Sequence, residues 1–515
     1  MPVSSRRGDP AEIPSYADTV ILGGGTSGCV IAGLLAEQSD ESILVLEAGP
    51  DFGPLADGRW PADLVDASAL GNSHDWGYSS EDCYPNRVVN FERARVIGGC
   101  SAHNGCAAVW GSRRDYDAWA AAGNDGWSTN DLLPLFETAT QRLRVRTYDL
   151  DELTPFQRAC LEAGPGAGLP IVENLNDLDE EIGISPSPVN IAGGVRWNTA
   201  FAYLDPVRHK PSLTICGGAM ADRLTIENGR VTAVHVVDVN GLRRVNADRV
   251  VLAGGAYGSP AMLLRSGIGD PEDLRAAGIT PVHALPGVGR NLHDHPSAMI
   301  TYAGTSTLEQ QMTEFGRNQW MPEETVIAKA RSSVCEDGFD IHFYPVGGPD
   351  MTSPSGWKWE LKVACMTPIS RGSVRLTSND PFARPVIDHR YLSDPCGLDR
   401  DVLVDAVALA RELANQPGLS DPLGEELSPG PSVATNEAIR AFVDISCVHY
   451  YHPVGTCKMG PASDSAAVID ARGAVHGLEG VFVADCSIMP VIPRANTNVP
   501  AVVVGEKIAR LLLNA

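Results

Sequence analysis

The chain has 515 residues, of which 43% are hydrophobic and 20% charged, with 52 glycines and 37 prolines. This composition is that of an ordinary folded protein with many turns, and the length suits two to four domains or one large fold with an inserted region. The formal net charge of −24 repels phosphate backbones, so nucleic acid is excluded as an expected partner.

The cysteines and the start of the chain bear on its compartment. The 12 cysteines are scattered without a CxxC pair, and the opening segment MPVSSRRGDPAEIPS is polar where a signal peptide would carry an apolar core. No stretch reaches the roughly 20 apolar residues of a membrane span. We therefore expect a cytoplasmic monomer or homodimer with no membrane partner and no bound metal.

The N-terminal region is expected to form a strand, a glycine turn, a helix and a second strand. Residues 18–22 (DTVIL) are apolar and run into GGGTSG. Residues 29–38 (CVIAGLLAEQ) suit a helix with small residues at its start, and residues 42–47 (SILVLE) suit the next strand. This order opens a Rossmann-type sheet.

Glycines in the first turn have the spacing of a dinucleotide site. Gly23, Gly25 and Gly28 satisfy GxGxxG, which gives a tight turn, close backbone approach to a pyrophosphate and close packing of helix on strand. Glu47 ends the second strand, where a carboxylate suits the ribose hydroxyls. A purely structural turn is the alternative, but the flanking elements and Glu47 favour a nucleotide. The motif does not separate NAD from FAD.

Three further regions have recognisable patterns. Residues 231–253 predict a β-hairpin turning at Asn240-Gly241, a pair that tolerates the positive φ of a type I′ turn. Between about 300 and 445, alternating stretches such as DIHFYPV and WELKVAC and a helical stretch, DVLVDAVALARELA, indicate a separate sheet domain on the substrate side. Residues 481–485 (VFVAD) predict a buried strand, and residues 499–513 a docking helix.

Five segments resemble, in order, signatures of the glucose-methanol-choline (GMC) oxidoreductases. They are RVIGGCSAHNG (95–105), GGAYGSPAMLLRSGIG (254–269), PGVGRNLHDHP (286–296), HPVGTCKMG (452–460) and VADCSIMPVIPRANTNVP (483–500). The resemblance covers nearly the whole chain. It implies an FAD-dependent enzyme that oxidises a primary alcohol to an aldehyde.

The fold class implied is α/β, a Rossmann-type FAD-binding domain with a discontinuous antiparallel-sheet substrate domain. The expected FAD-binding segments are residues 15–155, 206–300 and 446–515. Residues 156–205 form a substrate-side segment, and residues 301–445 the substrate-binding domain.

The resemblance also assigns residues to the flavin. Gly98 and Gly99 would let backbone lie against the isoalloxazine face, where a Cβ would collide, and Asn104 would hydrogen-bond the ring. Asp485 resembles the acidic residue whose neighbouring amides meet the pyrophosphate and flavin O2, and the following helix would stabilise negative charge on the reduced ring. Ser259-Pro260 is expected to open a helix, either beside the cofactor or capped in the core. The other expected cofactor contacts are Thr26, Ser27, Ala48, Arg95, Cys100, Gly105, Ala221, Ala253, Gly254, Ala495, Asn496 and Thr497.

The catalytic pair follows from the last two segments. Alcohol oxidation by a flavin removes the hydroxyl proton and transfers hydride to N5, so it needs a base close to the ring, and histidine suits that demand. His452 heads HPVGTCKMG, where the family has its active-site histidine. The second family position aligns with Asn496, which can hold the substrate oxygen but cannot relay a proton. Asn498 is the rival for this position.

His103 raises the question of a covalent flavin. The stretch GGCSAHNG resembles choline oxidase in particular, whose histidine at this position is attached to the flavin 8α-methyl group. The alternative is a histidine that only packs by the dimethylbenzene edge. The resemblance leaves both open.

The identity of the alcohol also stays open. A choline-type substrate wants an aromatic cage with an acid, and the sequence offers Tyr450, Tyr451, Trp320, Trp357 and Trp359 with Glu309 or Glu360, while His342 lines the site or is simply buried. The C-terminal segment resembles oxidases of aryl or furanic alcohols equally well. A sugar alcohol oxidase or dehydrogenase and a non-redox flavoprotein lyase remain alternatives, and the electron acceptor is oxygen or another molecule.

Overall fold

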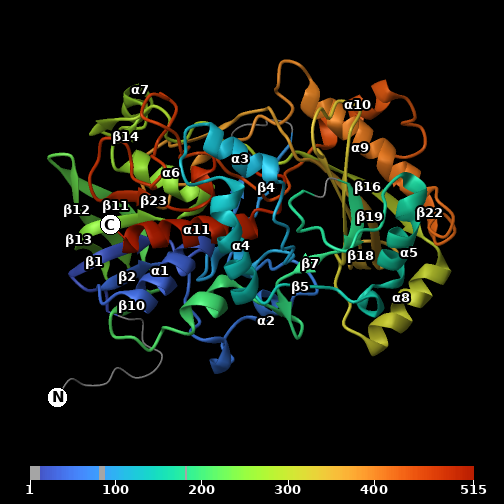
Figure 1. Ribbon diagram of the computed structural model, residues 1–515, viewed down its shortest axis with the longest axis horizontal. Helices are drawn as coiled ribbons and strands as arrows, with labels where there is room; N and C mark the ends of the chain where they lie inside the picture. Colours follow the sequence, from blue (N-terminus) through green and yellow to red (C-terminus); the bar gives the residue numbers. More distant parts are fainter. Residues whose placement is uncertain (1–11, 81–86, 180–181, 515) are drawn as a thin grey trace.

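Two sheets organise the protein, and Figure 1 shows them side by side. The computed structural model describes residues 12–80, 87–179 and 182–514. The first sheet combines strands from both ends of the chain with four strands from residues 213–252, and the second takes most of its strands from residues 297–428. Segments far apart in sequence therefore meet where the two sheets face each other.

The first sheet has seven strands in the order β10-β2-β1-β13-β12-β11, with β23 paired to β13. They are β1 (Tyr16–Leu22), β2 (Ile43–Leu46), β10 (Leu213–Cys216), β11 (Met220–Glu227), β12 (Arg230–Asp238), β13 (Gly241–Leu252) and β23 (Val481–Val483). The ladder from β10 through β2, β1 and β13 to β23 is parallel, whereas β11, β12 and β13 are antiparallel. β2 is buried along its whole length, as expected for a parallel strand covered on both faces.

Helices α1 (Thr26–Gln38) and α11 (Asn498–Leu513) pack against each other beside this sheet (Figure 1). Their contact relies on small residues, because Ser27 Oγ donates a 2.8 Å hydrogen bond to the Ala501 carbonyl oxygen. A Cβ on Gly505 would lie 2.9 Å from that of Val30. The other helices of this part are α2 (Ala62–Val65), α3 (Arg113–Ala121), α4 (Thr129–Arg142), α6 (Gly255–Arg265) and α7 (Pro271–Ala276).

The second sheet has six antiparallel strands in the order β22-β16-β19-β18-β17-β6. They are β6 (Gly183–Pro186), β16 (Ser297–Gly304), β17 (Val326–Ala330), β18 (Ile341–Pro349), β19 (Trp357–Cys365) and β22 (Leu423–Ser428). Helices α5 (Pro155–Ala163), α8 (Ser306–Asn318), α9 (Leu398–Ala414) and α10 (Asn436–Ser446) belong to this part, and α5 and α9 pack on the sheet. Short ladders pair β3 (Tyr78–Ser79) with β4 (Asn90–Phe91), β5 (Arg146–Thr147) with β7 (Pro188–Val189), β8 (Ile191–Ala192) with β9 (Val195–Arg196), β14 (Ile268–Gly269) with β15 (His283–Ala284), and β20 (Ser373–Arg375) with β21 (Val386–Asp388).

The two faces of this second sheet differ in polarity because side chains alternate along a strand. On β18, Ile341 and Phe343 join the apolar core under the helices. Their neighbours His342 and Tyr344 therefore point to the opposite face. Lys362 of β19 pairs directly with Tyr344, so it shares that face. This polar face of the sheet is directed toward the first domain.

The expected segmentation of the chain can be compared with these strands. β6 comes from residues 156–205 and lies in the second sheet, next to β17. β16 begins at Ser297, so the boundary expected at residue 300 falls inside a strand. We propose that the substrate-side domain begins just before Ser297 and otherwise keeps the predicted segments.

Two predictions of local structure are wrong. The hairpin of β12 and β13 forms, but Asp238 pairs with Gly241, so Val239 and Asn240 are the central residues of the turn. Of these residues only Gly241 has a positive φ, 103°, whereas a type I′ turn needs positive φ at both central positions. Helix α6 begins at Gly255, which leaves Ser259-Pro260 inside the helix rather than at its start.

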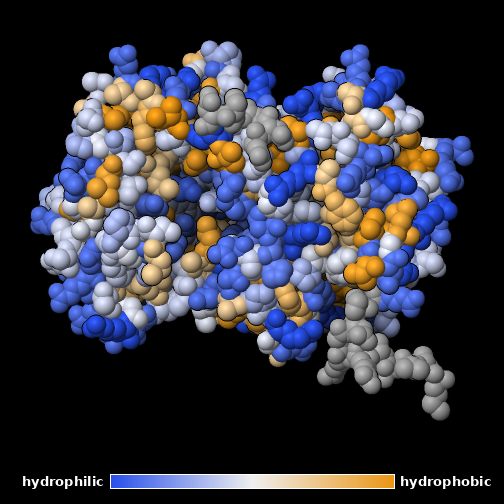
Figure 2. All heavy atoms as spheres, turned by 180° about the vertical axis from the view of Figure 1, so that it is seen from behind, coloured by the Kyte–Doolittle hydropathy of each residue, from blue (hydrophilic) through white to orange (hydrophobic). Residues whose placement is uncertain are grey.

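Charged and polar residues dominate the face seen in Figure 2, and hydrophobic residues are scattered among them. This agrees with the formal net charge of −24. In the part of the chain that the structure describes, every helix is too short or too polar to cross a bilayer.

The close packing of α1 on β1 gives a test of the glycine turn. A Cβ on Gly28 would lie 2.0 Å from the Gly23 carbonyl oxygen, so Gly28→Ala is expected to lower the free energy of unfolding by about 1–3 kcal/mol. Gly258→Ala in α6 is the matched control, because its Cβ would meet nothing within 4 Å. Chemical denaturation of both variants checks this, and equal stabilities would contradict it.

Candidate active site and cofactor cradle

The predicted nucleotide residues gather at the carboxyl ends of the parallel strands. Gly23 follows β1, Glu47 follows β2 and Ala253 follows β13. A Cβ on Gly23 would lie 2.6 Å from the Ala253 carbonyl oxygen, so the two turns touch. Ligands of open α/β sheets bind at this edge.

Glu47 holds this edge together and keeps capacity for a ligand. Its carboxylate is 6% exposed and accepts hydrogen bonds from the amides of Gly24, at 2.9 Å, and Gly49, at 2.7 Å. Burial raises the pKa of Glu47, and the two amides oppose that shift. A carboxylate offers about four lone pairs, so two remain for ribose hydroxyls.

The loop of residues 95–105 lies across the glycine turn. Gly98 N–H donates to the Gly24 carbonyl oxygen at 2.7 Å. Gly99 has a φ of 53°, and a Cβ there would lie 2.6 Å from the Cα of Gly25. Because Gly98 and Gly99 have no side chains, the loop can pack on the glycine turn. The sequence predicted that these glycines lie against the flavin ring, and it did not predict this contact with the turn.

Asp485 joins the last strand to α6. Its Oδ2 accepts a hydrogen bond from the Gly255 amide, at 2.8 Å, and one from the Ser259 hydroxyl, at 2.6 Å, while its Oδ1 accepts the Ser487 amide at 2.7 Å. Burial raises its pKa. Asp485 therefore caps α6, which explains why the helix begins before Ser259.

Three observations show that the cradle fits FAD. Gly25 has an ordinary negative φ and its Cβ would come no closer than 3.6 Å to the protein, so packing within the chain does not require glycine there. Gly255 has a φ of 75°, which itself favours glycine, but nothing lies within 4 Å of its Cβ position, so space is left beside the first amide of α6. Arg95 Nε is buried without a hydrogen-bond partner among the described residues. Glycine without a packing need and an orphaned donor both suit a large polar ligand.

The other expected cofactor residues surround the same edge. Ala48 follows Glu47, Ala221 lies at the start of β11, and Gly254 precedes α6. Thr26 and Ser27 open α1, whose first amides point to this edge. Cys100, Asn104 and Gly105 continue the loop from Gly99, and Ala495, Asn496 and Thr497 precede α11.

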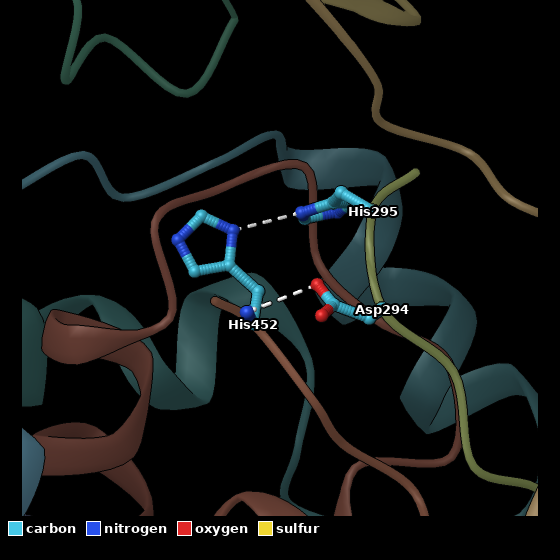
Figure 3. Close-up of side chains that lie close together, drawn as sticks. All are labelled: Asp294, His295 and His452. Atoms are coloured by element: carbon cyan, nitrogen blue, oxygen red, sulfur yellow. Dashed lines mark hydrogen bonds between the residues drawn. The ribbon is translucent and has the colours of Figure 1, made fainter. Parts of the chain in front are cut away.

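His452 lies in a buried cluster with His295 and Asp294, as Figure 3 shows. The Nδ1 atoms of the two histidines are 3.0 Å apart. The backbone amide of His452 donates to Asp294 Oδ1 at 2.9 Å. The ring and the main chain of His452 are thus both fixed, by two consecutive residues of another segment.

The backbone explains how these residues meet. His293 and Ser297 pair with Val454 and Val448 in an antiparallel arrangement, so the second segment has two more residues between its paired positions than the first. The extra length is taken up at Tyr451, which has a φ of 68°. This bulge carries the following residue, His452, toward His295.

Asn496 lies on the other side of the His452 ring. Its amide nitrogen is 3.4 Å from His452 Nε2, and its carbonyl oxygen accepts a 2.9 Å hydrogen bond from the Tyr344 hydroxyl. Asn498, the rival candidate, instead turns its amide toward Asn190 at 3.5 Å. The structure therefore places Asn496, and not Asn498, opposite His452.

These contacts determine where the proton of the His452 ring lies. Burial lowers the pKa of His452 well below its ordinary value, and the nearby His295, His342, Arg93 and Lys362 lower it further, so the ring is neutral. The Asn496 amide donates to Nε2, so the single N–H is on Nδ1 and donates to His295. Burial also lowers the pKa of His295 to about 3. The lone pair on Nε2 is then available as a base.

His103 lies in the loop over the cradle and is 7% exposed. Its Nε2 contacts the Ser73 carbonyl oxygen at 2.5 Å, so this nitrogen carries the proton and Nδ1 carries the lone pair. Burial lowers the pKa of His103, which keeps the ring neutral.

Only part of the predicted aromatic cage lies at the site. The ring centroid of Tyr450 is 5.0 Å from that of His452, whereas the ring of Tyr451 packs against that of His449 at 4.3 Å. Trp359 is 1% exposed in the core under the helices, and Trp357 stacks on it at 5.6 Å. Trp320 also packs against that core. The three tryptophans are thus assigned to the core side rather than to the site.

The acidic residues of the predicted cage also need revision. Glu309 lies on α8, which packs on α5 and not on the polar face. Glu360 shares the polar face of β19 with Lys362. The sequence did not predict Glu324 as a residue of the site. It lies next to the predicted cofactor loop, because a Cβ on Gly105 would be 3.0 Å from its Oε2.

Four further residues of the site were missed, and some left a signal in the sequence. Asp294 and His295 stand within PGVGRNLHDHP, a segment already noted for its resemblance. Tyr344 is two residues from His342 on an alternating strand, so it had to share the face of His342. The position of Lys362 at the site follows from the register of β18 and β19, and no local sequence pattern predicted it.

Comparisons with known proteins agree with this geometry. Two family models described as GMC oxidoreductase match residues 17–297 and 368–505. The oxygen-dependent choline dehydrogenase 1 of Chromohalobacter salexigens is 34% identical over 96% of this chain and 94% of its own, and the oxygen-dependent choline dehydrogenase of Paraburkholderia xenovorans is 35% identical over 96% and 93%. The crystal structure of pyridoxine 4-oxidase from Mesorbium loti is 30% identical, with a TM-score of 0.85 over 96% of this chain and 99% of the other.

Glu47 offers a test of the cradle. A glutamine would turn an N–H group toward one of the two amides, so Glu47→Gln is expected to weaken FAD binding about 10- to 100-fold, the cost of an unsatisfied buried pair. Fluorescence titration of flavin-free protein checks this, in a His103→Ala background so that no bond to this ring interferes. Exposed Glu437→Gln is the control, and an unchanged affinity for Glu47→Gln would refute the role.

Proposed function

The chain belongs to the GMC oxidoreductase family, and on that premise we propose that it oxidises a primary alcohol to an aldehyde, with His452 as the base. Bound FAD supplies a two-electron acceptor whose N5 takes the hydride. The observation that supports this role is the pair of His452 Nε2 and the Asn496 amide, facing each other at the end of a buried hydrogen-bond chain.

The proposed roles follow from the contact between these two residues. A separation of 3.4 Å is long for a hydrogen bond, so an alcohol oxygen that lies beside the pair can replace this contact with one hydrogen bond to each residue. It would donate its proton to Nε2 and accept the Asn496 N–H. Tyr344 holds Asn496 so that the amide nitrogen, and not the oxygen, faces the base.

The site favours an alcohol on a planar, unsaturated carbon framework. Tyr344 and Tyr450 have ring centroids 6.1 Å apart with planes at 55°, next to the base. Aromatic walls of this kind suit planar rings. One similar protein of known structure is a pyridoxine 4-oxidase, whose name describes such a substrate.

Choline is the second candidate. The similar curated proteins are named choline dehydrogenases. Glu324 supplies a carboxylate near Tyr450, the combination that a trimethylammonium group requires. For either alcohol, the final electron acceptor is oxygen or another molecule.

Replacing His452 tests the mechanism. Because general base catalysis contributes about 10²- to 10⁴-fold, His452→Ala is expected to slow anaerobic flavin reduction by an alcohol by at least about 10²-fold, with the flavin still bound. Stopped-flow absorbance measures this. His235→Ala is the control, because His235 lies on β12 and its side chain hydrogen-bonds only to Thr225 among the described residues. A near-normal rate of flavin reduction in His452→Ala would contradict the role of His452 as the base. If no alcohol lowers the flavin absorbance of the parent protein, a non-redox lyase is favoured instead.

We further propose that His103 is the residue attached to the flavin 8α-methyl group, because its ring is buried, neutral and has one free lone pair. The N–C bond would replace one C–H bond of that methyl group, whose proton is lost and whose two electrons would pass to the flavin and on to the electron acceptor. After acid precipitation the flavin should stay in the pellet of the parent protein and leave the pellet of His103→Ala. A colourless pellet from the parent protein, with all flavin in the supernatant, rules the bond out.

A further inference from the structure

Lys362 is a charged side chain on the polar face of the second sheet, next to the proposed base. Its strand register sets it opposite Tyr344, the residue that orients Asn496. Its Nζ lies 5.0 Å from the ring centroid of Tyr450 and 4.7 Å from that of Tyr451. The ammonium group thus contacts the aromatic residues that adjoin His452.

No carboxylate among the described residues forms an ion pair with Lys362. Glu324 and Glu360 are its strongest electrostatic neighbours, followed by Asp294 and Glu92, and they partly oppose the lowering of the Lys362 pKa by burial. Lys358, on the same face of β19, is different, because its Nζ is 2.9 Å from Glu323 Oε2. Lys362 is therefore a cation held by aromatic rings, with donors left for another partner.

We infer that Lys362 is a specificity residue that selects alcohols carrying an anionic or strongly accepting oxygen at the end remote from the hydroxyl group. This inference rests on the proposed function of His452 and extends it to the substrate class. The hydroxyl group hydrogen-bonds to His452 and Asn496, the planar body packs on Tyr344 and Tyr450, and the remote oxygen accepts hydrogen bonds from Lys362.

The same placement disfavours a quaternary ammonium substrate. A trimethylammonium group binds to the faces of aromatic rings, and the rings of Tyr450 and Tyr451 already contact the Lys362 ammonium group. A second cation there would also be repelled by Lys362 in a site shielded from water. Glu324 offsets part of this repulsion, and it also gives a neutral or zwitterionic substrate a place for a hydrogen-bond donor.

A charge series of one alcohol tests the inference in the holoenzyme. Benzyl alcohol, 4-(hydroxymethyl)benzoate and 4-(hydroxymethyl)benzyltrimethylammonium differ in the charge of the remote group, and choline is added for comparison. Anaerobic flavin reduction gives a limiting rate and an apparent Kd for each. In the parent protein, the ratio of limiting rate to apparent Kd should be at least about tenfold higher for the benzoate than for the benzylic ammonium.

Variants of Lys362 must change this ratio. Lys362→Met removes the charge while keeping most of the unbranched side chain, and should bring the anion-to-cation ratio to within about threefold of one. Lys362→Glu should invert the ratio, because it reverses the sign of the charge. Benzyl alcohol, which has no remote charge, is the reference to which the values of both charged alcohols are compared within each variant. Lys358→Met is the matched control and should leave the ratio at its original value.

The outcomes separate this inference from the proposed function. A parent protein that prefers the ammonium alcohol or choline overturns the inference, as does a ratio that survives in Lys362→Met or falls equally in Lys358→Met. In each of these cases alcohol still bleaches the flavin and the role of His452 stands. If no alcohol in the series bleaches the flavin, the proposed function fails and the inference fails with it.

Discussion

The hydrogen bond between His295 and His452 is the constraint on which the proposed chemistry depends. A bond between two Nδ1 atoms requires one ring to donate and the other to accept. Because Asn496 donates to the far nitrogen of His452, that ring must carry its proton on Nδ1. His295 therefore acts as a positioning residue. It fixes the tautomer and the direction of the lone pair without touching the substrate, as second-layer partners of catalytic histidines commonly do.

Burial makes this arrangement possible and also limits it. Both histidines have lowered pKa values because the charged form of a ring loses its hydration in the interior. Two neutral rings can share one hydrogen bond, whereas two charged rings at 3.0 Å would repel each other. When His452 accepts the proton of an alcohol, His295 still offers the lone pair of its Nδ1 to the N–H of the imidazolium ring. The pair thus accommodates the charge that the reaction creates.

The sequence predicts the cradle better than it predicts the catalytic site, for a physical reason. Gly23, Gly28 and Glu47 act through local backbone geometry, so their spacing along one strand-turn-helix-strand unit already determines what they do. His452 and Asn496 were found through the segments that resemble the family. Tyr344 and Lys362 are different, because they reach the site through the pairing of β18 with β19, and a register between distant strands leaves no local pattern. The same limit explains the tryptophans of β19, which alternation assigns to the core only once the orientation of the strand is known.

The charge that selects the substrate also adjusts the base. Lys362 is one of the cations that lower the pKa of His452, after burial and the neighbouring histidines. In the free enzyme this effect keeps Nε2 unprotonated but makes it a weaker proton acceptor. An anionic group bound at Lys362 neutralises part of that field and raises the proton affinity of His452 only in the complex. A carboxylate at this position, which would suit an ammonium substrate, would raise the pKa of the base before any substrate binds. Substrate charge and base strength are therefore linked at this site, and an anionic alcohol is the partner for which both effects act in the same direction.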